Sequence, residues 1–266
     1  MDRVTPLACA VVGPAQAPPL LLLHGWLADR RDWHGVVDRL GERFRCIVMD
    51  LPGHGASPGA DPDGLGAAAA AVWATLDHLG VERTAVAGYS MGGRLALHVA
   101  LAQPQRCAAL AVLGASPGLI GATDRAARAA LDDALARDLD GSELREFISR
   151  WYRLPLFSGL AAALTAAEFE ALLDRRAEAQ PARLAAALRY LSVGRQASLW
   201  PQLPKLTMPL LWLAGAVDAH YHAVAQAAST ASPDARFAAL AGCSHALLLE
   251  DPAGVARELA GFLDAT

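Results

Sequence analysis

The stretch from Gly88 to Arg94, with the sequence GYSMGGR, limits the possible folds of this chain more than any other. The apolar residues 84–87 before it predict a strand, and the alanine- and leucine-rich residues 95–102 after it predict a helix. Because a turn this sharp brings flanking side chains into collision with the strand and the helix, it requires glycines. Such a turn holds Ser90 above the end of the sheet, at a helix N-terminus whose N–H groups stabilise negative charge. The alternative is a glycine-rich turn in which the serine is incidental.

Strand and helix patterns alternate along most of the chain, which predicts an α/β fold with a mostly parallel central sheet flanked by helices. The expected strands are residues 4–12, 20–23, 46–49, 84–87, 108–113, 209–215 and 236–240. The expected core helices are residues 32–44, 65–79 and 95–102, and a last helix that begins at Pro252 after the N-cap Asp251. Residues 20–23 are all leucine, as expected of a strand buried on both faces.

The alternation stops in the middle of the chain, where residues 120–203 show only helical patterns. This segment is too long and too apolar for a structureless loop. We therefore expect a helical cap at residues 120–203, inserted in an α/β core that residues 1–119 and 204–266 form together.

Composition narrows the classes of partner. The formal net charge of -4 provides no basic surface for nucleic acid. No apolar run approaches the roughly 20 residues of a membrane span, and no signal-peptide pattern is present, so we expect a cytoplasmic protein without membrane insertion. The four cysteines lack metal-ligand spacing, and neither a metal nor a cofactor is expected. The chain has a single lysine, Lys205, so a given arginine is weaker evidence of function than usual.

Three residues in the order serine, aspartate, histidine each follow a predicted strand. A serine hydroxyl is a poor nucleophile or base until an imidazole takes its proton, and the imidazole needs a carboxylate to fix its tautomer. His245 follows strand 236–240, and Asp218 follows strand 209–215. Since ligands bind outside the carboxyl ends of parallel strands, we expect Ser90, Asp218 and His245 to form a catalytic triad. The competing interpretations are that Asp218 only caps a helix and that His245 is an ordinary core or surface histidine.

Backbone N–H groups near the serine are expected to form an oxyanion hole. Met91, directly after Ser90, supplies one donor, and the loop after residues 20–23 supplies the other, with Trp26 the expected residue. Gly25 permits the bend of this loop, and His24 can hold it by hydrogen bonds.

These motifs resemble the α/β-hydrolase superfamily along essentially the whole chain, and their order is the one that superfamily uses. The residues that carry the resemblance are His24-Gly25, Asp50-Leu51-Pro52-Gly53-His54-Gly55, the Ser90 turn, Asp218, His245 and Glu250-Asp251-Pro252. One departure is Cys243-Ser244 before His245, where such families often have a glycine. The resemblance implies the fold and leaves the reaction open.

A narrower resemblance extends into the predicted cap. The chain is similar to the menaquinone-pathway synthases that make 2-succinyl-6-hydroxy-2,4-cyclohexadiene-1-carboxylate. The similar features are Leu51 to Gly55, Gly88 to Arg94, Ser116-Pro117-Gly118-Leu119, Arg125, Arg128, Trp151-Tyr152, Pro155-Leu156-Phe157, Arg176, Leu188-Arg189 and Gln196-Ala197-Ser198-Leu199-Trp200. This resemblance implies a lyase that abstracts a ring proton and eliminates pyruvate from an enolpyruvyl substrate without a covalent intermediate, with Ser90 as the base.

The same resemblance implies a set of substrate-binding residues, namely Tyr89, Arg94, Arg128, Trp151 and Arg176. Arg94 has independent support, because it lies one helical turn beyond Ser90 and an arginine binds a carboxylate with two parallel hydrogen bonds. The alternatives are that Arg94 forms a structural salt bridge and that Arg128 and Arg176 are solvated. Arg175 competes with Arg176 for the same role.

Two other functions stay open. A serine hydrolase would cleave an ester, lactone or carbon–carbon bond through an acyl-enzyme on Ser90. A small-molecule receptor would keep the fold without turnover. We expect the partner to be a small anionic substrate, and the sequence leaves the oligomeric state open.

Overall fold

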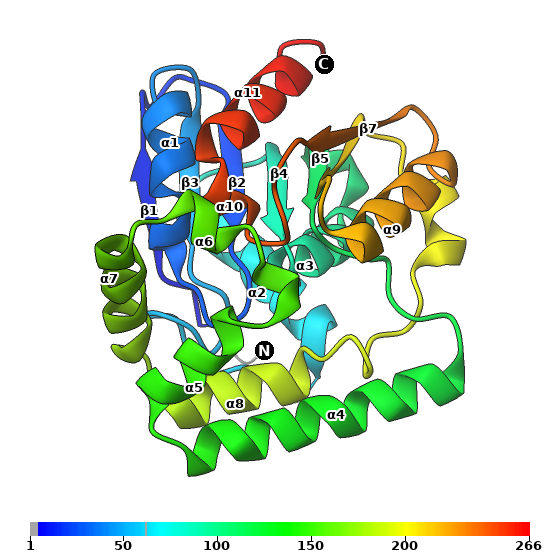
Figure 1. Cartoon of the computed structure of the whole chain (residues 1–266). Helices are drawn as coiled ribbons and strands as arrows, with labels where there is room; N and C mark the ends of the chain where they lie inside the picture. Colours follow the sequence, from blue (N-terminus) through cyan, green and yellow to red (C-terminus); the bar gives the residue numbers. More distant parts are fainter. Residues whose placement is uncertain (1–4, 62) are drawn as a thin grey trace.

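The structure is a computed structural model that describes residues 5–61 and 63–266. In this part of the chain a seven-stranded sheet has the order β1-β3-β2-β4-β5-β6-β7 (Figure 1). Strand β1 pairs antiparallel with β3, and the other neighbours are parallel. The strands are β1 (Cys9–Val12), β2 (Pro19–Leu23), β3 (Arg45–Met49), β4 (Thr84–Tyr89), β5 (Cys107–Leu113), β6 (Leu210–Gly215) and β7 (Ala235–Leu240). The expected mostly parallel α/β sheet is therefore confirmed.

Helices cover both faces of the sheet, which explains the continuous apolar strands. On β2, Leu21 and Leu23 pack into one core and Leu20 and Leu22 into the other. The first core lies under α2, α3 and α9, and the second under α1 and α11. The bounds of these helices are α1 (His34–Leu40), α2 (Gly64–His78), α3 (Met91–Ala102), α9 (Ala219–Thr230) and α11 (Pro252–Leu263); the short α10 (Leu247–Glu250) precedes α11.

Two predicted elements differ from the structure. The expected helix at 32–44 is a 3₁₀ turn, Arg30–Trp33, followed by α1, which ends at Leu40. Residues 41–44 instead form the turn that leads into β3, where Arg43 N–H and Phe44 N–H both donate to Leu40 O. The first strand covers only residues 9–12 of the expected 4–12, and Val4 lies outside the described residues. The N-cap of the last helix is as predicted, since the Asp251 side chain accepts from Gly254 N–H at 2.7 Å.

The sheet order places a crevice beside the serine. The chain runs from β2 outward to β3 and then returns to β4 on the other side of β2, so β2 and β4 are neighbours. Leu23 at the end of β2 is in register with Gly88 in β4. The loop after β2 and the turn after β4 therefore open side by side, at the kind of switch point where α/β sheets bind ligands.

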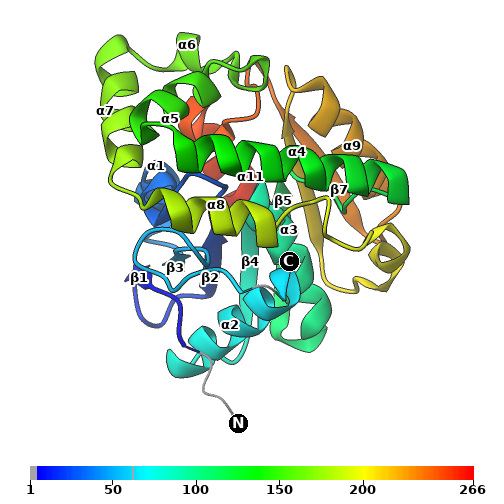
Figure 2. The ribbon, with the colours of Figure 1, turned by 90° about the horizontal axis from the view of Figure 1, so that it is seen from below.

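Between β5 and β6 the described elements are all helical. They are α4 (Ala122–Gly141), α5 (Leu144–Tyr152), α6 (Leu160–Ala163), α7 (Ala166–Ala177), α8 (Pro181–Tyr190) and the 3₁₀ segments Pro155–Phe157 and Trp200–Lys205. Helices α4 and α8 run side by side across one end of the sheet (Figure 2). Apolar residues of α4, α5, α7 and α8 form a third core, which also includes Leu27 and Ala246. The division of the chain into a core of residues 1–119 and 204–266 and a cap of residues 120–203 stays a prediction.

Candidate active site

The serine turn is strained and depends on its glycines. Ser90 has φ 54° and ψ −113°, a conformation that costs a residue with a side chain on the order of 1–3 kcal/mol. A Cβ atom on Gly88 would overlap Gly92 O, and one on Gly92 would overlap the carbonyl oxygens of Leu23 and His24. Strand β4, helix α3 and the loop after β2 are thus packed too closely for any other residue, which fixes the position of Ser90.

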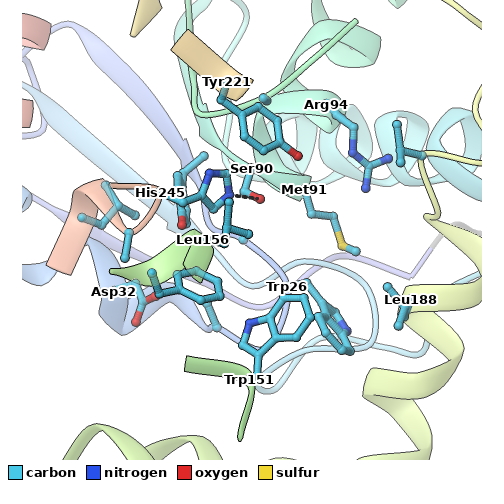
Figure 3. Close-up of a pocket in the computed structure, with 18 of the residues that line it drawn as sticks. Trp26, Asp32, Ser90, Met91, Arg94, Trp151, Leu156, Leu188, Tyr221 and His245 are labelled. Atoms are coloured by element: carbon cyan, nitrogen blue, oxygen red, sulfur yellow. Dashed lines mark hydrogen bonds between the residues drawn. The ribbon is translucent and has the colours of Figure 1, made fainter. Parts of the chain in front are cut away.

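The three triad candidates lie within hydrogen-bonding distance of one another (Figure 3). Ser90 Oγ is 3.0 Å from His245 Nε2, and His245 Nδ1 is 2.8 Å from Asp218 Oδ2. Because a carboxylate only accepts, Nδ1 carries the proton and Nε2 is free to accept the serine proton. Asp218 also caps α9, since its Oδ1 accepts from Tyr221 N–H at 3.1 Å. One carboxylate therefore does both: its Oδ1 caps α9 and its Oδ2 accepts from the imidazole.

The two residues that are expected to supply the oxyanion-hole N–H groups, Trp26 and Met91, lie in the same cavity as Ser90. Trp26 and Met91 both line the cavity that contains Ser90 and His245. Within the described part of the chain, neither backbone N–H donates to another backbone group outside the regular elements. His24 holds the loop as expected: Nδ1–H donates to Gly25 O at 2.7 Å, and Nε2 accepts from Leu51 N–H at 3.0 Å. Burial lowers the pKa of His24, which keeps it neutral in this arrangement.

The cavity beside Ser90 encloses about 920 Å³, including its opening to solvent. Arg94 lines it, although its side chain is buried, with 9% of the residue exposed. Its Nη1 donates to Gln196 Oε1 at 3.2 Å, and among the described residues it forms no ion pair. Burial lowers the pKa of Arg94 to about 10, which records the cost of a charge without a carboxylate partner. The salt-bridge alternative for Arg94 is therefore wrong in this structure.

Comparison with known proteins shows the family of this chain. A family model for the alpha/beta hydrolase fold matches residues 18–252. The 2-succinyl-6-hydroxy-2,4-cyclohexadiene-1-carboxylate synthase of Serratia proteamaculans (strain 568) is 35% identical over 94% of this chain and 95% of that protein. The synthase of the same name from Salmonella agona (strain SL483) is 34% identical over 94% of this chain and 96% of its own length. The chain belongs to this synthase family of α/β hydrolases.

Solved structures agree with this assignment. MenH from S. aureus superposes with a TM-score of 0.90 at 27% identity, with 98% of each chain covered. A thermophilic esterase from Thermogutta terrifontis superposes with a TM-score of 0.79 at 25% identity, covering 97% of this chain and 93% of its own. The resemblance stated from the motifs, and the fold it implied, are thus confirmed.

Four of the five expected substrate-binding residues line the cavity, namely Tyr89, Arg94, Arg128 and Trp151. Arg128 forms an ion pair with Asp132 on the next turn of α4, at 2.8 Å, and 43% of its side chain is exposed. Trp151 packs edge-on against Trp26, with the ring centroids 4.9 Å apart. Figure 3 shows this tryptophan pair across the cavity from Arg94 and Tyr221.

The fifth residue, Arg176, lies elsewhere. It is buried and donates to Asp32 Oδ2 at 2.5 Å and to Tyr152 Oη at 3.1 Å. Arg175 donates to Asp32 Oδ1 at 2.8 Å, so both arginines of α7 pair with one core carboxylate. Asp32 itself lines the cavity, whereas neither arginine does. In this structure, then, Arg175 and Arg176 join α7 to the 3₁₀ turn before α1, and neither of them reaches the cavity.

Sequence reasoning missed several residues that form the cavity. Tyr221 lines it and packs on the imidazole of His245, with ring centroids 4.6 Å apart. Figure 3 shows the Tyr221 hydroxyl directed toward Arg94. The only available signal was its position three residues after Asp218, which places it in the first turn of α9 beside the triad. Phe157, whose ring centroid is 5.9 Å from that of the imidazole, was part of the family-like segment 155–157, but no role in the site was predicted for it.

The departure at Ser244 has a structural reason. Its hydroxyl and its N–H both bind the Glu250 carboxylate, and its hydroxyl also accepts from Gly159 N–H at 3.1 Å. His245 N–H donates to Leu156 O at 3.1 Å. The hydroxyl of Ser244 therefore connects the histidine loop both to α10 and to Gly159 before α6, whereas a glycine would keep only the N–H contact to Glu250.

Two other features are absent from the described residues. No helix there is long and apolar enough to cross a bilayer. Residues 5–61 and 63–266 also contain no group of three or more histidine, cysteine or acidic side chains arranged to hold a metal ion.

Proposed function

We propose that this protein is a lyase that eliminates pyruvate from 2-succinyl-5-enolpyruvyl-6-hydroxy-3-cyclohexene-1-carboxylate and forms 2-succinyl-6-hydroxy-2,4-cyclohexadiene-1-carboxylate. The product is the one named in the synthases that are 33–35% identical to this chain. The observation that carries the proposal is Arg94, a buried cation that lines the triad cavity and pairs with no carboxylate among residues 5–61 and 63–266. Such a charge favours an anionic substrate, which a neutral ester is not.

The triad geometry suits proton abstraction. Nε2 of His245 accepts the Ser90 proton, and Ser90 Oγ removes the ring proton next to the succinyl carbonyl. The electron pair of the broken C–H bond moves into the carbonyl, which becomes an enolate oxygen. Asp218 stabilises the imidazolium that forms. The serine acts as a base in this scheme and forms no covalent bond.

The second half of the reaction expels the enolpyruvyl group. The enolate oxygen lies within reach of the Trp26 and Met91 N–H groups, which stabilise its charge. Its electron pair returns to the ring and forms the C2–C3 double bond, the existing C3–C4 double bond moves to C4–C5, and the bond from C5 to the enolpyruvyl oxygen breaks. The leaving enolate takes up the proton that His245 holds and becomes pyruvate. Atoms and charge balance without water, a metal or an oxidant.

A serine hydrolase is the second candidate. The 3.0 Å distance between Ser90 Oγ and His245 Nε2 also suits attack on an ester or lactone, and the esterase of Thermogutta terrifontis has the same fold. The difference lies in the intermediate, since a hydrolase acylates Ser90 and the proposed lyase does not.

Release of pyruvate tests the proposal directly. The purified protein is incubated with the enolpyruvyl substrate, and pyruvate is measured by coupling to lactate dehydrogenase, with Ser90→Ala as the control. Absence of pyruvate at high protein concentration would exclude the lyase. Rapid acid quench with short p-nitrophenyl esters tests the second candidate, which requires a burst and an acylated Ser90. A receptor would instead show a ligand-induced rise in melting temperature without turnover.

A further inference from the structure

The guanidinium of Arg94 donates a hydrogen bond to a neutral side chain that is distant in the sequence. Gln196, in the segment after α8, is buried, with 4% exposed, and its Oε1 accepts from Arg94 Nη1 at 3.2 Å. It lies outside the set of residues that line the triad cavity, whereas Arg94 belongs to that set. Gln196 therefore contacts the guanidinium without lining the cavity itself.

The orientation of the Gln196 amide is dictated by its two partners. Its Nε2 donates to Pro117 O at 3.2 Å, and a carbonyl can only accept, whereas an arginine can only donate. The amide oxygen must therefore face Arg94. Pro117 O is fixed in turn, since it also accepts from Leu199 N–H at 2.7 Å. A Cβ atom on Gly118 would lie 3.1 Å from Nε2, so glycine at that position gives the amide its space.

Two other arginines near the site are treated differently by the fold. Arg176, which is buried but does not line the cavity, pairs with Asp32, and Arg128, which lines the cavity, pairs with Asp132. A carboxylate neutralises an arginine, whereas an amide oxygen accepts a hydrogen bond and leaves the charge in place. A glutamate at position 196 would occupy nearly the same volume and would form such a pair with Arg94.

We propose that Gln196 is a positioning residue that directs Arg94 into the cavity and leaves its charge uncompensated, so that the site selects a carboxylate of the substrate. This inference rests on the proposed function for the identity of the substrate, but not for the binding of an anion. A negative charge at position 196, about 7 Å from a carboxylate that binds the other nitrogens of the guanidinium, is expected to weaken binding about 10- to 100-fold at an effective dielectric constant of about 20.

Binding is measured with 2-succinylbenzoate, the aromatic counterpart of the product, and with its dimethyl ester, which keeps the same carbon skeleton, adds two methyl groups and has no charge. The fluorescence of Trp26 and Trp151, which line the cavity, reports occupancy without turnover. Gln196→Glu should raise the Kd of the dianion on the order of 10- to 100-fold and that of the diester less than threefold. Gln226→Glu adds the same charge on the exposed surface of α9 and should change neither value.

Two further variants keep the inference falsifiable. Gln196→Leu removes the amide without adding charge, and should weaken dianion binding less than glutamate does, by about 3- to 10-fold for a lost buried hydrogen bond. In an Arg94→Met background, Gln196→Glu should no longer have a selective effect on the dianion. Equal weakening of dianion and diester, or dianion binding by either Gln196 variant within twofold of the parent protein, would overturn the inference. Failure of the pyruvate assay with charge-selective binding intact would remove the proposed reaction and leave the role of Gln196 standing.

Discussion

Replacing Arg94 by methionine should remove activity and stabilise the fold at the same time. Methionine has a similar length, fits the buried environment and carries no charge. In the parent protein, a substrate carboxylate about 4 Å from the guanidinium gains about 4 kcal/mol at an effective dielectric constant of about 20. Loss of that interaction corresponds to a fall in kcat/KM of about 1,000-fold.

The stability change has the opposite sign. Burial lowers the pKa of Arg94 from 12.5 to about 10, which corresponds to a cost of about 3 kcal/mol for the buried charge at pH 7. Removing the guanidinium also leaves Gln196 Oε1 without its donor, which costs about 1–3 kcal/mol. We expect a net gain of about 1 kcal/mol in the free energy of unfolding, or a rise in Tm of about 2–4 °C.

The assay pairs pyruvate release with urea denaturation of the same samples. Arg257→Met is the matched control, because Arg257 is exposed on α11 and far in sequence from the cavity residues. It should leave kcat/KM unchanged and should not raise Tm. A loss of activity below threefold in Arg94→Met would mean that Arg94 does not touch the substrate. A variant less stable than the parent protein by more than about 1 kcal/mol would show that the charge is compensated by the fold.

Three other perturbations follow from the site and from the buried histidines. Asp218→Asn keeps the cap of α9 but cannot hold the imidazole tautomer, so kcat should fall about 10³- to 10⁴-fold with little change in Tm. Asp218→Ala loses the cap as well and should also lower the free energy of unfolding by about 1 kcal/mol. Equal Tm values in the two variants would contradict the double role of Asp218. Tyr221→Phe keeps the ring packed on His245 and should lower kcat/KM about 10-fold if the hydroxyl donates to the substrate, with an unchanged value as the opposite result. Burial lowers the pKa of His54 from 6.5 to about 3, so the unfolded chain takes up a proton at a higher pH than the folded protein does. The free energy of unfolding therefore falls as the pH drops from about 6.5 toward 3, by about 1.4 kcal/mol per pH unit in the middle of that range. Denaturant titrations at pH 4.5 and 6 should show a slope smaller by about one proton in His54→Gln, and an unchanged slope would mean that His54 is protonated in the folded protein.

The sequence was sufficient for the fold and for bringing the triad candidates together. Ser90, Asp218 and His245 each follow a strand of a parallel sheet, and the carboxyl ends of such strands meet at one edge. Their proximity therefore follows from local patterns together with a single topological rule. The close packing at Gly88 and Gly92 was equally local, because the sharp turn leaves no space for a Cβ atom.

The cap residues could not be placed in the same way. Whether a cap side chain reaches the cavity depends on how α4, α7 and α8 pack on the core, and helical periodicity does not give that orientation. Arg175 and Arg176 illustrate this, since both converge on Asp32, an aspartate that the sequence marked only as the start of a helix. Gln196 was visible as part of a family-like segment, but its partner Arg94 is 102 residues away.

The contacts of the histidine loop have a consequence for engineering. Leu156 O and Gly159 N–H belong to the stretch between β5 and β6, yet they hold the backbone of His245 and the hydroxyl of Ser244. A chimera that exchanges residues 120–203 between relatives would therefore also exchange two contacts that hold the loop of His245. Grafts that retain residues 155–159 of the recipient should preserve the geometry of the His245 imidazole. To transfer substrate specificity, one would therefore exchange residues 120–203 without residues 155–159.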